Sequence, residues 1–174
     1  RGISHERAKN WSPAERDFKA ALSILPLAKP GQPYARERAQ VLNYLAYTSA
    51  DRHENIDEAF KMLKDAVTLT DGRDGYIVDS LGWAYYQLGD YEEAVGHIER
   101  AVDLNPADPI IGEHLGDVYW RVGRKLEAKF QWQHAKDNGP EPVDLKRIED
   151  KLVNGLPPDE VTKPAENKSG NTNG

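Results

Sequence analysis

The five histidines are the residues of this sequence best suited to bind a metal ion or to transfer a proton. They are His5, His53, His97, His114 and His134. Zinc sites on helices draw ligands from closely spaced histidines, as in the HExxH pattern, where one helical turn separates two imidazoles. No HExxH or His-x-x-x-His pair occurs in this sequence. The histidine spacing therefore predicts neither a metal site nor a catalytic base.

Other residue types that could act in catalysis also lack the sequence contexts that catalysis requires. The sequence contains no cysteine, no phosphate-cradling glycine loop and no serine in a G-x-S-x-G context. Glu92 and Glu93 are adjacent acids, but they stand where a helix is expected to begin, and the helix dipole favours acids there. We therefore predict that the chain is not an enzyme and that it binds no cofactor.

The composition is that of a polar chain with an acidic balance. Of 174 residues, 39% are hydrophobic and 30% are charged, and the formal net charge is −6 at pH 7. Nucleic-acid binding depends on clustered lysine and arginine at the phosphates, so this balance argues against a nucleic-acid partner. No apolar run approaches the roughly 20 residues that a spanning helix needs, so we predict no membrane insertion.

Small and aromatic residues recur at a fixed distance in the sequence. The structural unit that this repeat encodes must therefore position any functional side chains. The stretch GWAYYQLGDYEEAVGHIERAVDLNP returns as GDVYWRVGRKLEAKFQWQHAKDNGP, at an offset of 116 − 82 = 34 residues. The matched pairs are Gly82 and Gly116, Tyr85 and Tyr119, Gly89 and Gly123, Ala94 and Ala128, Ala101 and Ala135, and Pro106 and Pro140.

Two earlier copies are less regular. LAYTSADRHENIDEAFKMLKDAV forms a third copy with one extra residue in its turn, and SPAERDFKAALSILP forms the second half of a fourth. Counting back from Ala14 reaches Gly2 where the middle of that copy's first helix should lie. We therefore expect that helix to be cut by the start of the chain.

Each copy predicts two antiparallel helices. Val78, Leu81, Gly82 and Tyr85 follow the i, i+3, i+4, i+7 spacing of one helical face. Residues 88–90, Leu-Gly-Asp, predict a turn in which Asp90 caps the next helix, and proline after Asn105 ends that helix. Glycine and alanine at fixed points allow the two helices to approach closely.

These features resemble the tetratricopeptide repeat family, in which a 34-residue helix-turn-helix is stacked many times. The resemblance implies an all-α, right-handed α-solenoid over residues 1–140. Its expected parts are a partial repeat 1–26, a crossover linker 27–38, which is either stiff or mobile, and repeats over about 39–74, 75–108 and 109–140. Val143, Leu145, Ile148 and Leu152 then predict a capping helix over 141–156, and polar residues 157–174 predict a disordered tail.

The resemblance also implies a site, because the first helix of each repeat lines the concave groove in this family. Of the residues at the groove positions, we expect ten to contact a partner: Asn43, Tyr47, Tyr76, Asp79, Trp83, Tyr86, Glu113, Asp117, Trp120 and Arg121. Aromatic side chains beside acids suit a protein or peptide with apolar anchors and some basic residues. The alternative is that these aromatics pack within the chain, against the linker or the next helix.

The most direct interpretation is a non-catalytic scaffold for protein–protein interaction. Two alternatives stay open: a regulatory or recruiting domain of a larger enzyme, and a self-association module that forms a homo-oligomer. Phrases such as VLNYLAY and HLGDVYWRVGRKLEAKFQW also look like the C-terminal part of long repeat proteins of alphaproteobacteria. That similarity implies the periplasm or the cell envelope, with the cytoplasm as the alternative.

Overall fold

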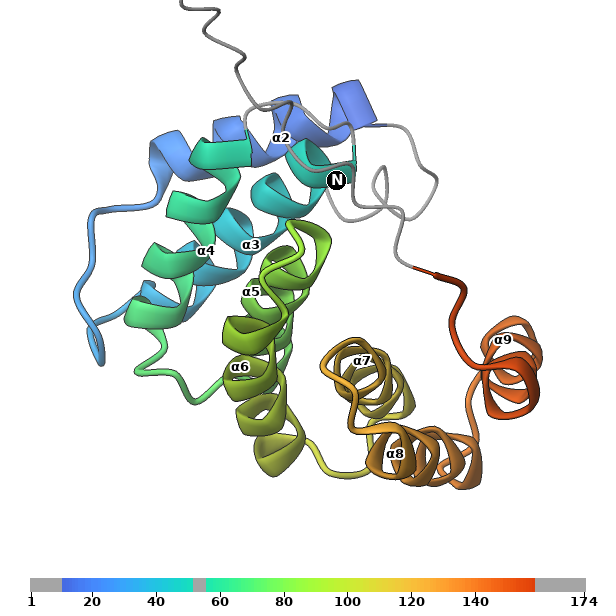
Figure 1. The fold of residues 1–174 in the computed structure, drawn as a ribbon. Helices are drawn as coiled ribbons and strands as arrows, with labels where there is room; N and C mark the ends of the chain where they lie inside the picture. The colour runs from blue at the N-terminus through green and yellow to red at the C-terminus, as the bar shows by residue number, and fades with distance from the viewer. Residues whose placement is uncertain (1–10, 52–55, 159–174) are drawn as a thin grey trace, which may run out of the picture.

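The computed structural model describes residues 11–51 and 56–158, and it folds them into helices joined by short connections (Figure 1). Within these two ranges there is no strand, so the prediction of an all-α repeat solenoid is confirmed. None of the described helices is long and apolar enough to cross a bilayer. The helices are α2 (Trp11–Ile24), α3 (Ala35–Asp51), α4 (Ile56–Leu69), α5 (Gly75–Gln87), α6 (Tyr91–Leu104), α7 (Pro109–Arg121), α8 (Lys125–Asp137) and α9 (Pro142–Asn154).

Glycines at equivalent repeat positions allow close packing within two of the helix pairs. A Cβ atom on Gly82 of α5 would lie 2.5 Å from Cγ1 of Ile98 in α6, and one on Gly116 of α7 would collide with the Trp132 ring of α8. Both approaches are too close for any side chain, so only glycine permits them. The partners share the repeat offset as well, since 132 − 98 equals 116 − 82.

The turns inside these two pairs are also equivalent. Gly89 and Gly123 adopt φ angles of 80° and 85°, which glycine reaches without steric cost. In the first turn, the Gly89 amide donates to the Tyr86 carbonyl and the Asp90 amide donates to the Tyr85 carbonyl, each at 3.0 Å. The predicted turn at residues 88–90 is therefore confirmed.

Helix capping follows a different rule from the one predicted. Asp90 stands at the N-cap of α6, but its side chain makes no capping hydrogen bond. The capping aspartates precede the first helices of the repeats instead. Asp74 accepts from the Ile77 amide at the start of α5, and Asp108 accepts from the amides of Ile110 and Ile111 at the start of α7.

The crossover between α2 and α3 is shorter than predicted. Helix α3 begins at Ala35, so residues 35–38 of the predicted linker 27–38 are helical. The last proline of this segment is Pro33, and residues 35–39, ARERA, are strong helix formers.

Side chains of α3 hold the end of α2 in place. The Phe18 and Tyr44 rings stack with their centroids 5.1 Å apart. The Arg38 guanidinium donates to the carbonyl oxygens of Leu22 and Leu25, at 3.5 and 3.2 Å. The Leu22 carbonyl lies in the last turn of α2 and the Leu25 carbonyl lies just after it, where no further helical amide is available to donate.

Helix α9 occupies the place predicted for the capping helix. Ile148 is fully buried against the core of α6 to α8, and Leu152 packs against the same core. The predicted apolar face is incomplete, because Val143 at its start is 73% exposed. The predicted cut helix before residue 11 and the predicted disordered tail from residue 159 onward lie outside the described residues.

Candidate functional site

The ten predicted partner-binding residues lie on α3, α5 and α7, the first helices of three successive pairs. These helices adjoin one another in order, since α3 contacts α5 and α5 contacts α7 (Figure 1). We call the face of α3, α5 and α7 that bears the ten residues the groove face. The structure divides them into a part that packs within the chain and a part that stays accessible.

The two acids of α7 are buried beneath α9. Glu113 is 1% exposed and Asp117 is 4% exposed. The Arg147 guanidinium donates hydrogen bonds to both carboxylate oxygens of Glu113, at 2.6 and 2.5 Å. Lys151 Nζ bridges the two acids, at 2.5 Å from Glu113 and 2.7 Å from Asp117. The chain itself therefore supplies the cations that these acids were expected to find on a partner.

Burial and ion pairing act on the two acids in opposite directions. Burial raises the pKa of Glu113, but hydrogen bonds from Arg147 and Lys151 outweigh this effect and hold the pKa below its ordinary value. Burial also raises the pKa of Asp117, and there Lys151 only partly offsets the effect, so the pKa stays raised. Trp132 Nε1 donates to Asp117 at 2.9 Å and completes its set of partners.

Trp120 and Arg121, at the end of α7, contact the segment that follows α9. A Cβ atom on Gly155 would collide with the Trp120 ring, so the ring covers this glycine directly. Lys125 Nζ lies 3.9 Å from the ring centroid in a cation–π contact. Arg121 donates to the Pro157 carbonyl oxygen at 2.7 Å. Both predicted partner-binding residues thus pack within the chain.

Asp79, Trp83 and Tyr86 of α5 are joined to α7 through His114. Nδ1 of His114 lies 2.9 and 3.0 Å from the two carboxylate oxygens of Asp79. The Trp83 ring stacks on His114 with centroids 4.0 Å apart, and on Tyr86 at 4.4 Å. Tyr86 also accepts a hydrogen bond from Arg121 at 3.3 Å. This cluster ties two repeats together.

The His114–Asp79 contact predicts a pH dependence of stability. Burial lowers the pKa of His114, but the charge and hydrogen bond of Asp79, with Asp117 and Glu113 nearby, outweigh burial and raise it above its ordinary 6.5. A raised folded-state pKa stabilises the fold at pH values below the unfolded pKa, and this contribution is lost as pH rises through the folded pKa.

We therefore expect the free energy of unfolding of the wild type, relative to His114→Gln, to decrease as pH rises above about 6.5. Urea titrations of both proteins at several pH values measure this difference. Burial lowers the pKa of His97, but this residue is unchanged in both proteins and cancels. A difference that stays constant from acid to alkaline pH contradicts the expectation.

The accessible part of the groove face lies between α3 and α5. Tyr47 is 48% exposed and lines a small pocket of about 90 Å³ together with Ser80, Trp83 and Gln87. Asn43 stands one helical turn before Tyr47. Its Oδ1 is buried and has no hydrogen-bond partner in the part of the chain that the structure describes. We call these five residues the open part of the groove face.

A second pocket adjoins the first. It has a volume of about 200 Å³, and Leu63, Ala84 and Gln87 line both pockets. Its other walls are apolar and come mainly from α4, where Ile56 and Phe60 contribute. Tyr76, the remaining predicted residue, is also accessible, at 58% exposed, but it lines neither pocket. It lies beside Asp108, whose charge raises the pKa of Tyr76.

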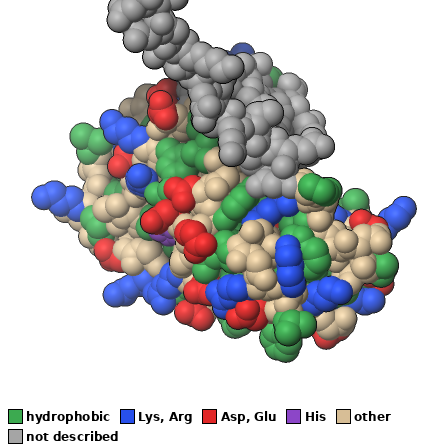
Figure 2. Space-filling model, in the orientation of Figure 1, with side chains coloured by type: hydrophobic (Ala, Val, Ile, Leu, Met, Phe, Trp, Pro, Cys, Tyr) green, Lys and Arg blue, Asp and Glu red, His purple; other side chains and the backbone are tan. Residues whose placement is uncertain are grey.

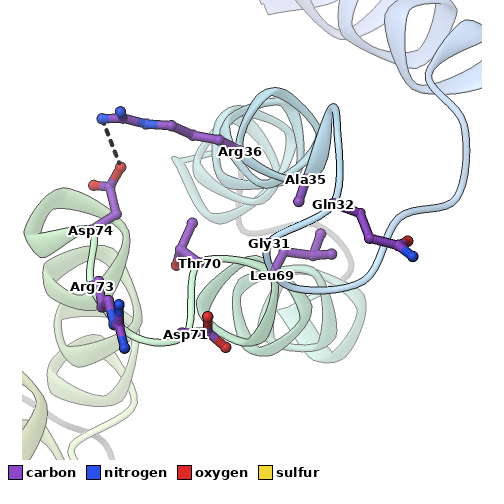
Figure 3. A pocket seen from close by; sticks show the side chains of 9 residues that line it. All are labelled: Gly31, Gln32, Ala35, Arg36, Leu69, Thr70, Asp71, Arg73 and Asp74. Atoms are coloured by element: carbon purple, nitrogen blue, oxygen red, sulfur yellow. Dashed lines mark ion pairs between the residues drawn. The ribbon is translucent and has the colours of Figure 1, made fainter.

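A larger hollow of about 340 Å³ lies between the crossover and the turn from α4 to α5 (Figure 3). Several of its polar groups already have partners. Arg36 and Asp74 face each other across one side at 3.7 Å, and the Thr70 hydroxyl donates to the carbonyl oxygens of Ala66 and Val67 at 3.1 Å. This hollow presents no convergent set of ligand-binding groups.

The charged side chains of the described residues suggest neither a metal site nor a polyanion site. Among the described residues, no three histidine, aspartate or glutamate side chains are grouped as metal ligands. On the face shown in Figure 2, acidic, basic and apolar side chains are intermingled.

Sequence reasoning missed the role of Arg147, Lys151 and His114. The repeat offset could have found the first two, since 147 − 113 and 151 − 117 both equal 34, and each pair joins opposite charges. His114 stands 114 − 79 = 35 residues after Asp79, one more than the offset. Residues of opposite charge that lie about one repeat length apart in the sequence were therefore the signal that could have revealed these contacts.

Comparison with known proteins identifies the repeats. Residues 82–123 match the family model described as TPR repeat, the tetratricopeptide repeat. The TPR repeat-containing protein PA4667 of Pseudomonas aeruginosa is 28% identical over 117 residues, which are 67% of this chain and 18% of that protein. This chain therefore spans less than a fifth of that relative's length.

Solved structures share the fold. A thermophilic TPR protein of Thermus thermophilus, TTC0263, superimposes with a TM-score of 0.69 at 21% identity, over 87% of this chain and 78% of that one. The first TPR domain of Spaghetti (RPAP3), solved bound to the HSP90 peptide SRMEEVD, superimposes with a TM-score of 0.56 at 19% identity, over 68% of this chain and 95% of that one. At these identities the likeness shows the fold alone.

Proposed function

Because this chain is a tetratricopeptide repeat protein, we propose that it is a non-catalytic scaffold that holds a segment of a partner protein against the open part of its groove face. The fold and the relatives support a protein-interaction role in general. The chain spans 18% of the Pseudomonas relative, so the proposal concerns a binding module and not the activity of a whole protein.

The observation that carries the proposal is the exposure of Tyr47 beside Trp83 at a pocket. Tyrosine and tryptophan supply large contact areas with few rotatable bonds, and they are enriched where binding energy is concentrated.

The proposed site is smaller than the ten residues that the sequence suggested. Glu113, Asp117, Trp120 and Arg121 pack with α9 and the segment after it, and Asp79 pairs with His114. Using them for a partner would require these internal contacts to break. The neighbour RPAP3 supports a peptide as the ligand class, since its domain was solved with one bound.

Substituting Tyr47 in the open part should weaken binding without unfolding the chain. We expect Tyr47→Ala to weaken binding of peptides selected from a random display library by about tenfold, since truncated hot-spot aromatics cost more than about 1 kcal/mol. Fluorescence anisotropy with labelled peptides measures this change, after circular dichroism shows that both proteins have equal helix content and equal melting temperatures.

The matched control is Phe130→Ala. Phe130 is an exposed aromatic of α8, 68% accessible, and lies outside the groove face. Peptides that bind the wild type and Tyr47→Ala equally well, or that lose affinity only with Phe130→Ala, would show that the partner binds elsewhere.

A further inference from the structure

We infer that the partner segment is neutral and apolar where it binds, with two neighbouring apolar side chains anchored in the two adjoining pockets beside Leu63 and Ala84. The inference rests on the proposed function and adds the chemistry of the partner to it. It replaces the expectation, drawn from the acids of the groove positions, that the partner carries basic residues.

The pockets supply the first argument. Their volumes of about 200 and 90 Å³ both exceed the roughly 30 Å³ that one water molecule occupies in the liquid. They share Leu63, Ala84 and Gln87, so side chains in the two pockets would lie next to each other. Apolar walls favour apolar occupants, since burying apolar area from water is favourable on both sides.

The distribution of charge supplies the second argument. None of the described side chains that line either pocket is charged. The acids that the groove positions do carry are already paired within the chain, Glu113 and Asp117 with α9 and Asp79 with His114. A basic partner would therefore meet no unpaired acid among these three residues, and its charges would lose hydration without compensation.

A random peptide display library tests the inference directly. Peptides are selected on the wild-type chain, and those that lose affinity for Tyr47→Ala are sequenced. We expect an enriched pair of apolar residues, few lysines or arginines, and affinities that change less than about twofold between low and high salt, because screening acts on charges.

Two kinds of variant separate pocket filling from charge. Ala84→Leu adds bulk where the pockets meet, and we expect selected peptides to bind it at least about tenfold more weakly. Gln87 is exposed at the rim of both pockets, so Gln87→Glu and Gln87→Lys change charge without altering the core. We expect both to weaken binding to a similar degree, because either charge is desolvated by an apolar ligand.

The outcomes distinguish this inference from the proposed function. Peptides that are rich in lysine and arginine, bind Gln87→Glu more tightly and lose affinity in salt would overturn the inference and leave the proposed function intact. Apolar peptides that depend on Tyr47 but bind Ala84→Leu as tightly as the wild type would do the same. If no selected peptide depends on Tyr47, the proposed function fails, and the inference fails with it.

Discussion

Replacing Trp132 with alanine should lower the free energy of unfolding by about 3–5 kcal/mol, the usual cost of truncating a buried tryptophan. Trp132 is fully buried, and its ring fills the space that Gly116 leaves open between α7 and α8. The substitution would leave a cavity at this contact. It would also remove the hydrogen bond from Nε1 to Asp117, whose burial already raises its pKa.

Urea denaturation followed by circular dichroism measures this loss. Trp132→Phe keeps an aromatic ring but cannot donate to Asp117, so we expect a smaller loss that separates the hydrogen bond from the cavity. Leu126→Ala on the same helix is the surface control, since Leu126 is 86% exposed and should change stability by less than about 0.5 kcal/mol. Equal losses for Trp132→Ala and Leu126→Ala would mean that the α7–α8 contact contributes little.

Replacing Lys151 with methionine should cost about 3–5 kcal/mol, because it leaves buried carboxylates with too few partners. Lys151 is 12% exposed and is the cation that contacts both Glu113 and Asp117. Methionine keeps the length of the side chain and removes its charge. We therefore expect α9 to loosen from α7 and the midpoint of urea unfolding to fall.

Acid should partly rescue this variant. The pKa of Asp117 is already raised by burial, and losing Lys151 raises it further. A group with a raised folded-state pKa stabilises the fold more at low pH than at high pH, so the deficit of Lys151→Met should shrink as pH falls and Asp117 gains a proton.

The matched control is Lys136→Met. Lys136 pairs with Glu149 of α9, but these side chains are 37% and 49% exposed, so this loss should be about 0–1 kcal/mol. If both lysine variants lose the same stability, the pairing of Lys151 with buried acids does not hold α9 in place.

Much of the fold followed from the repeat. Gly82 and Gly116 were predicted to allow close helix packing, and each meets a large residue of the second helix. Gly89 and Gly123 stand at the predicted turns, and both adopt the positive φ that such turns require. Local signals were less reliable at helix starts, where Asp90 was predicted to cap α6 but makes no capping bond.

The site was harder to predict because groove positions face either a ligand or the next helix. The position of Glu113 in its repeat does not tell whether its carboxylate pairs with Arg147 or with a partner protein. The placement of α9 decides whether Glu113 is paired within the chain, and α9 was predicted from its apolar residues alone. The charged residues of α9, which reach over α7, were left out of that expectation. Pockets depend further on side-chain conformations across α3, α4 and α5, which no single-helix pattern encodes.

The contact of Asp79 with His114 joins α5 to α7, and the contacts of Glu113 with Arg147 and of Asp117 with Lys151 join α7 to α9. Stability in such an array is approximately a sum of nearest-neighbour couplings, so it behaves as a linear chain of linked units. The last coupling in the described chain is a pair of buried acids closed by two cations, which makes fraying from α9 costly. Among the described helices, α7 and α9 should therefore be the last to separate from each other, whereas the open part of the groove face lies on α3 and α5.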